Sequence, residues 1–88
     1  MDITSDCGLI ESKAGFHKVV AKALDFPAWY GKNLDALYDC LTGVPDEMEI
    51  RFQNWEIMAI KLEGYAAVAK KVILRAASEN PHVAVSFL

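Results

Sequence analysis

The stretch Trp29-Tyr-Gly-Lys-Asn-Leu-Asp-Ala-Leu-Tyr-Asp-Cys-Leu-Thr-Gly43 is the most informative part of this 88-residue chain. It predicts a short helix, in which side chains three, four and seven positions apart share one side. One side is apolar and would anchor the helix to a core through Leu34, Leu37 and Leu41. The neighbouring side is polar and carries Asp35, Asp39 and Thr42. The two carboxylates are therefore expected to face outward on a rigid element, available to a positively charged group.

Strand-like and helix-like segments alternate along the chain. Strands are expected at residues 3–5 or 3–7, 48–52 and 83–88. Helices are expected at residues 12–24, 33–43, 55–63 and 65–78. Because each connection between strands is long enough to hold helices, the strands are expected to pair in parallel. The pattern predicts an α/β fold, a small three-stranded parallel sheet packed with about four helices, in a single domain over residues 1–88.

Several polar residues, glycines and a proline mark the expected ends of the helices. The residues expected to cap helix N-termini are Ser12, Asn33 and Asn54. The residues expected to end helices are Pro27, Gly43 and Gly64, with Gly43 in a left-handed conformation. Residues 27–32 are expected to form an exposed loop in which Gly31 supplies backbone freedom.

The net charge of −3 is distributed unevenly. Residues 25–49 carry six acidic side chains and one basic side chain, whereas the other 63 residues carry six acidic and eight basic ones. A concentrated negative patch repels nucleic acid and attracts basic partners. We therefore expect a basic protein partner and no direct binding of RNA or DNA.

Cysteine usage and hydropathy point to the cytoplasm. Cys7 and Cys40 form neither a CxxC motif nor a spacing typical of metal ligands. One disulfide is an alternative, but two reduced thiols packed as small apolar groups are favoured. No apolar run approaches the roughly 20 residues that span a bilayer, and the first residues lack the features of a signal peptide. No membrane association, metal or cofactor is expected.

The sequence does not indicate a catalytic centre. His17 and His82 are expected to be lone surface histidines, and no GxSxG, HExxH or phosphate-loop motif occurs. Asp35 and Asp39 could form a general acid/base pair. On a short exposed helix, however, they would lack the burial that separates two carboxyl pKa values, so the chain is expected not to be an enzyme.

Residues 29–43 resemble, almost letter for letter, the inhibitory loop and helix of the barstar family, intracellular inhibitors of barnase-like ribonucleases. The resemblance runs along the whole chain, and its specific part is residues 27–43. It implies a barstar-like fold and one-to-one binding of a basic ribonuclease of the extracellular or toxin type. The positions that match the family's enzyme-binding surface are Trp29, Gly31, Asn33, Leu34, Asp35, Tyr38, Asp39, Thr42 and Gly43. The sequence departs from the family at Val44, where the best-known member has tryptophan, and at Ala76, which replaces an acidic residue.

The resemblance suggests how the helix would inhibit a ribonuclease. A carboxylate accepts paired hydrogen bonds from arginine much as a phosphate does, so the helix would mimic the RNA backbone with Asp39 at its centre. Trp29 is expected to contact the partner, and Tyr30 is expected to pack into the domain itself. Glu79 is expected to be a rim or solvent residue.

Three functional interpretations follow from these residues. The first is an inhibitor that protects its cell from a barnase-like ribonuclease, made by the same cell or delivered by a neighbour. The second is an interaction module of the same fold with a basic partner that is not a nuclease. The third, a small enzyme that uses the two aspartates, is remote.

Overall fold

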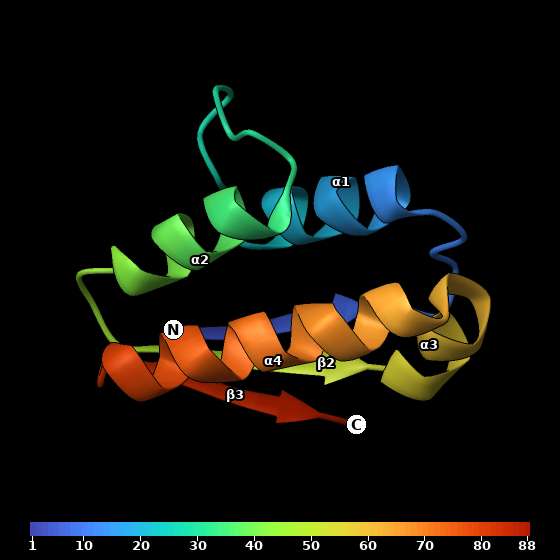
Figure 1. Cartoon of the computed structure of the whole chain (residues 1–88). Helices are drawn as coiled ribbons and strands as arrows, with labels where there is room; N and C mark the ends of the chain where they lie inside the picture. Colours follow the sequence, from blue (N-terminus) through green and yellow to red (C-terminus); the bar gives the residue numbers. More distant parts are fainter.

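Three parallel strands form one sheet in the order β1-β2-β3, and four helices complete the fold (Figure 1). The computed structural model covers residues 1–88. The elements are β1 (Asp2–Asp6), α1 (Lys13–Ala23), α2 (Leu34–Thr42), β2 (Met48–Gln53), α3 (Trp55–Leu62), α4 (Gly64–Glu79) and β3 (Val83–Phe87). The expected α/β class, the parallel pairing and the four helices are confirmed.

The sheet is apolar on one face and polar on the other. Ile3, Ile50 and Val85 lie in register across the three strands, on the face that the helices cover. The next positions, Thr4 and Arg51 among them, are on the open face and reach solvent. Parallel sheets usually have helices on both faces and continuous apolar strands. The alternation of apolar and charged residues in β2 fits the single covered face found here.

The helices cover the sheet in a fixed arrangement. Helix α1 packs over β1, α4 packs over β3, and α2 packs against α4. The connection between α1 and α2 rises as a loop above the helices, at the top of Figure 1. Seventeen buried hydrophobic residues from the helices, the sheet and the connecting segments form one core cluster. None of the four helices combines the length and apolar character needed to cross a bilayer.

Two of the three predicted N-caps are confirmed. The Ser12 hydroxyl accepts a hydrogen bond from the backbone N–H of Gly15 at 3.0 Å. The Asn33 side chain accepts one from the N–H of Ala36 at 2.7 Å. Each satisfies a backbone donor that has no partner inside its own helix. The first turns of α1 and α2 are thereby fixed by local sequence.

The third predicted cap is wrong in its mechanism. Asn54 precedes α3, but its backbone is left-handed (φ 58°) and its side chain makes no capping hydrogen bond. The Asn54 amide instead donates to the Asp6 carboxylate at 2.9 Å, at the end of β1. This hydrogen bond and that of the Gly8 N–H lower the pKa of Asp6. A tertiary contact thus replaces the expected local one.

Both glycine predictions for helix ends also need correction. Gly43 directly follows α2 and ends it as expected, but its φ of −92° lies in the right-handed region and not in the left-handed one. Gly64 begins α4, and the break between α3 and α4 falls at Glu63, with φ 51° and ψ −130°. A side chain with a Cβ atom rarely adopts that conformation. The change of direction is therefore located at a strained glutamate.

Candidate functional site

Helix α2 holds two free carboxylates toward solvent. Leu37 and Leu41 are fully buried and fix the inner side of the helix. Asp35 and Asp39 lie on exposed positions, and neither forms an ion pair within the chain. Two unpaired carboxylates one turn apart repel each other in the free protein. An external cationic group would relieve that repulsion.

The C-terminal end of α2 is held by a buried asparagine. Asn80 is 5% exposed, and its amide nitrogen donates to the carbonyl oxygens of Leu41 at 2.9 Å and Val44 at 3.0 Å. It also lies 3.3 Å from the carbonyl oxygen of Thr42. Carbonyls at the end of a helix have no partner inside the helix. Asn80, after α4, therefore fixes where α2 ends and where the following segment begins.

A polar cluster joins α2 to α4 at the surface. The Tyr38 hydroxyl donates a hydrogen bond to Glu79, which also pairs with Arg75. The hydrogen bond to Glu79 raises the pKa of Tyr38, and the same hydrogen bond lowers the pKa of Glu79. The Arg75 guanidinium lies 5.7 Å from the centre of the Tyr38 ring. Glu79 is exposed as expected, but it is engaged with Tyr38 and is not a free solvent residue.

The loop before α2 places two adjacent aromatic residues in opposite environments. Trp29 is 81% exposed, whereas Tyr30 is 5% exposed, as the sequence predicted. Asp25 and Lys32, both at φ 55°, have left-handed backbones at the two ends of the loop. Gly31 does not have a positive φ, so its expected role is wrong. A Cβ atom at this position would lie 3.3 Å from the Cβ atom of Ala36, which is a tight contact, so glycine eases the close approach of the loop to α2.

A buried histidine supports this loop from below. His17 is 1% exposed, so the prediction of a lone surface histidine is wrong. Its Nδ1 atom lies 2.7 Å from the Tyr30 hydroxyl and its Nε2 atom 2.6 Å from the Tyr65 hydroxyl. A neutral imidazole can donate at one nitrogen and accept at the other. Burial lowers the pKa of His17, which favours this neutral form. His17 thus links α1, the loop and α4.

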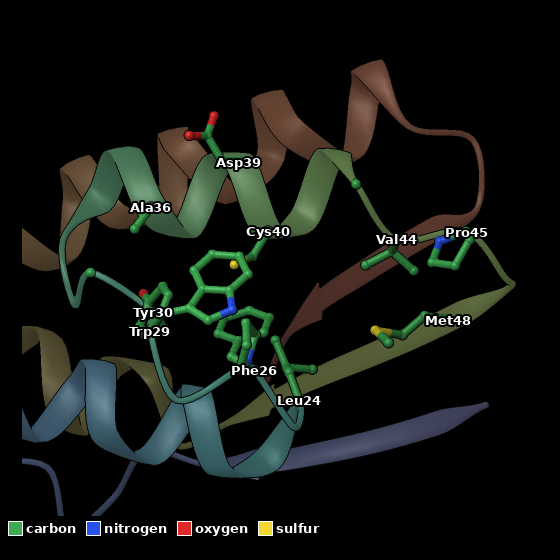
Figure 2. Close-up of a pocket in the computed structure, with 13 residues that line it drawn as sticks. Leu24, Phe26, Trp29, Tyr30, Ala36, Asp39, Cys40, Val44, Pro45 and Met48 are labelled. Atoms are coloured by element: carbon green, nitrogen blue, oxygen red, sulfur yellow. The ribbon is translucent and has the colours of Figure 1, made fainter.

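A groove of about 650 Å³ lies between the loop and the inner edge of α2. Its lining runs from Leu24 through the loop to Met48, and eight of its thirteen residues are hydrophobic. Figure 2 shows the Trp29 indole lying across the groove below Cys40. Asp39 stands on the rim with its carboxylate pointing away from the groove. The acidic face and the apolar groove therefore adjoin along one helix.

A second, smaller hollow of about 260 Å³ lies on the other side of α2, against α4. Its lining is Leu34, Asp35, Tyr38, Val72 and Arg75. Helix α2 is consequently a ridge with a hollow on each side. Asp39 borders the groove and Asp35 borders the second hollow, so the outward acidic face lies between the two.

Comparison with known proteins identifies the group to which this architecture belongs. The family model described as "Barstar (barnase inhibitor)" matches residues 1–87. The chain belongs to the barstar family. It is also similar to the Bacillus subtilis (strain 168) protein named "Putative ribonuclease inhibitor YrdF". The two are 42% identical over 64 residues, which cover 72% of this chain and 70% of that protein.

The residues matched to the barstar-family surface fall into three groups. The groove includes Trp29, Gly31, Asp39 and Gly43 in its lining. The second hollow includes Leu34, Asp35 and Tyr38. The remaining two, Asn33 and Thr42, use their side chains within the helix. The Thr42 hydroxyl donates to the carbonyl oxygen of Tyr38 at 2.9 Å, so it retains only acceptor capacity for a partner.

Sequence reasoning missed the residues that support this surface. Asn80 carries no local signal of its role, because no local pattern reveals contacts with residues 36 to 39 positions away. Ala76 is fully buried, so this departure from the barstar family does not lie on the exposed surface. Both cysteines are free, as expected, and Cys40 lines the groove.

Proposed function

We propose that this barstar-family protein inhibits a barnase-like ribonuclease by inserting the acidic face of α2 into the basic active site. The observation that carries the proposal is the pair of exposed carboxylates, Asp35 and Asp39, on a capped helix with no ion-pair partner in the chain. Because the helix is already fixed by buried leucines and by Asn80, little conformational freedom would be lost on binding.

The chemistry of ribonuclease inhibition follows from the charges. A site that cleaves RNA must hold cationic side chains to bind the phosphate and stabilise the charge that develops on it. A carboxylate accepts charge-assisted hydrogen bonds from arginine in a similar planar geometry. Asp39 would occupy the phosphate position, and Asp35 would pair with a second cation. The helix offers no phosphodiester bond, so the enzyme would be blocked and the inhibitor left intact.

The surroundings of α2 support a protein partner in a one-to-one complex. Exposed Trp29 is a large, stiff side chain of the kind that anchors protein interfaces. The excess of acidic residues between positions 25 and 49 would favour a basic partner. Two free thiols suit a reducing compartment, so we place the inhibitor in the cytoplasm. There it would protect the cell from its own ribonuclease or from that of a neighbour.

A titration of ribonuclease activity tests the proposal. Barnase-type ribonucleases cleave a fluorogenic RNA while the protein is added in increasing amounts, and a linear loss of activity ending at one equivalent is expected. The doubly neutralised variant Asp35→Asn, Asp39→Asn should lose inhibition. The matched variant Glu56→Gln, at an exposed position of α3, should retain it.

The opposite result would favour a different partner. If no barnase-type enzyme is inhibited at micromolar protein, ribonuclease inhibition is excluded for that class. The acidic face would then belong to an interaction module for a basic protein that is not a nuclease. Affinity capture with the wild type and the doubly neutralised variant would identify proteins that bind only the former.

A further inference from the structure

The outer edge of β3 is an unpaired and uncharged strand edge. We infer that two copies of the protein pair along this edge, antiparallel to each other about a two-fold axis at Val85, so that their two sheets become continuous. β3 is the last strand of the sheet, and Figure 1 shows no helix or strand beyond it. This surface is separate from the acidic face of α2, and the inference does not depend on ribonuclease inhibition.

The backbone groups of β3 point alternately toward β2 and away from it. The Leu88 N–H, directly after the strand, donates to the carbonyl oxygen of Phe52 in β2 at 2.8 Å. Even-numbered positions of β3 therefore bond β2, and the N–H and C=O groups of Val85 and Phe87 lie on the outer edge. Such a row of free backbone groups is a template for another strand.

The two edges of the sheet differ in how they are protected. The Cys7 N–H donates to the carbonyl oxygen of Gln53 at 2.9 Å, so the outer edge of β1 belongs to Asp2, Thr4 and Asp6. Charged side chains on an edge strand oppose pairing with another chain. β3 has the sequence VAVSF, with no charge and no proline. The edge of β3 therefore lacks the protection that the edge of β1 has.

An antiparallel pair centred on Val85 is self-complementary. Val85 lies opposite Val85 of the second copy, and Phe87 of each copy lies opposite Val83 of the other. Each Val85 N–H then donates to the Val85 carbonyl of the second copy, and each Phe87 N–H donates to the Val83 carbonyl. The N–H of Val83 is already bonded to the carbonyl oxygen of Asn80 at 3.0 Å. The pairing also places the half-buried Val85 and Phe87 side chains against apolar neighbours.

Helix α4 supplies an apolar contact at the same axis. The Lys70 Nζ atom lies 4.8 Å from the centre of the Phe87 ring, so this side of α4 borders the edge of β3. Leu74 follows one turn later and is 47% exposed. Because α4 runs antiparallel to β3 (Figure 1), Leu74 lies toward Val85. The two-fold axis brings the two Leu74 side chains together and removes them from water.

Charge favours the antiparallel arrangement of the two α4 helices. An axis at Leu74 places Lys70 of each copy toward the C-terminal end of α4 in the other. The last turn of α4 has no basic side chain, and its carbonyl groups carry a partial negative charge. The lysines of the two copies are thus kept apart, and each meets charge of the opposite sign. A second copy therefore fits this edge in charge as well as in register.

The acidic face of α2 stays free in the pair. Glu79, which bonds Tyr38 of α2, comes about two and a half turns after Lys70 along α4. The two residues therefore lie on opposite sides of α4, one toward α2 and the other toward β3. A pair of copies can bind two ribonuclease molecules, so an inhibition titration would still end at one equivalent.

Self-association measured by analytical ultracentrifugation tests the inference. A strand edge and one side of a helix make a small interface, of the class below about 1,200 Å² that associates weakly. We therefore expect a monomer–dimer equilibrium between about 10 µM and about 1 mM. Leu74→Lys sets two like charges against each other at the axis and should weaken the dimer by about tenfold or more. The matched control Val68→Lys, at a similarly exposed position (49%) on another side of α4, should change it by about twofold or less.

Amide hydrogen exchange locates the pairing at single residues. The N–H groups of Val85 and Phe87 should become protected as the protein concentration rises, whereas that of Thr4, on the opposite edge, should exchange fast throughout. A wild type that stays monomeric, or a dimer that both lysine variants weaken equally, would overturn the inference. Protection of the β3 edge that appears only when a ribonuclease is added would also overturn it and assign this edge to the enzyme. The activity titration measures inhibition by α2 separately from all of these outcomes.

Discussion

The Nδ1 atom of His17 lies 2.7 Å from the Tyr30 hydroxyl, directly beneath the loop that exposes Trp29. The other ring nitrogen of His17 bonds Tyr65 at the start of α4. One buried imidazole therefore connects the proposed binding loop to two helices. Its protonation state should influence the stability of the whole arrangement.

We expect the protein to lose stability as the pH falls below about 6.5. Burial lowers the pKa of His17, so the unfolded chain binds this proton more strongly than the folded protein does. The contribution of neutral His17 is complete above the unfolded pKa of about 6.5 and declines as the pH falls toward the folded pKa. Thermal melts from pH 8 to pH 5 should show the advantage of the wild type over His17→Gln shrinking. A constant advantage would contradict this.

The substitution Asn80→Ala should destabilise the protein and also weaken inhibition. It leaves carbonyl groups at the end of α2 without a buried donor, at a cost of about 1–3 kcal/mol for an unsatisfied group. Because the same amide bonds Val44 at the groove, the end of α2 should become less well ordered. Chemical denaturation and the ribonuclease titration measure the two effects. Ser78→Ala, on an exposed position nearby, is the control.

The fold was accessible from the sequence because its main determinants are local. Apolar and charged residues alternate in β2, which is typical of a strand with one buried face. Ser12 and Asn33 mark helix starts through hydrogen bonds to residues only three positions away. The two carboxylates on one helix were also evident from spacing. These features depend on residues close together in the chain, so periodicity and capping rules apply.

The remaining features arise from tertiary contacts. Nothing next to His17 in the sequence indicates that it lies between Tyr30 and Tyr65. The groove likewise depends on the packing of the loop against α2 and on the segment after it. Asn54 and Asp6 are 48 residues apart, and their contact replaced an expected helix cap. Such contacts can be identified only in the folded structure.

Relieving the strain at Glu63 should stabilise the protein. Its φ of 51° and ψ of −130° resemble the first central position of a type II′ turn, where glycine is preferred. Such strain costs about 1–3 kcal/mol, which glycine would remove. Glycine also loses more backbone entropy on folding, and this offsets part of the stabilisation. We expect Glu63→Gly to add about 1 kcal/mol, which raises the melting temperature by about 4–8 °C. Glu63→Ala keeps the Cβ atom, so equal stabilisation by both variants would argue against strain relief.

Association with a basic ribonuclease should be fast and should slow with added salt. The excess of acidic residues in positions 25–49 attracts the enzyme at long range. At physiological ionic strength, salt screens this attraction beyond about 8 Å. Stopped-flow rates measured from low to high salt test this. The variant Asp25→Asn, Asp46→Asn removes two of the six acidic residues and should show a shallower dependence. A flat dependence for the wild type would mean that apolar contacts guide the encounter.

Asp39→Ala should weaken inhibition far more than Glu56→Ala, without unfolding the protein. Asp39 has no ion-pair partner within the chain, so its loss removes no salt bridge from the fold. In the complex its partner would be a desolvated cation, and truncating one member of such a pair costs about 2–5 kcal/mol, a range informed by the barnase–barstar pair from this same family. This corresponds to about 30-fold or more in affinity.

The free protein supplies the complementary half of this test. Removing Asp39 relieves its repulsion from Asp35, so the melting temperature should stay constant or rise slightly. Glu56 is exposed on α3 and serves as the matched control because Glu79 bonds Tyr38 and also links α2 to α4. Calorimetric binding and thermal melts of both variants provide the comparison. A large drop in the melting temperature of Asp39→Ala would mean that this side chain stabilises the fold. Equal losses of affinity in the two variants would mean that Asp39 is not at the centre of the interface.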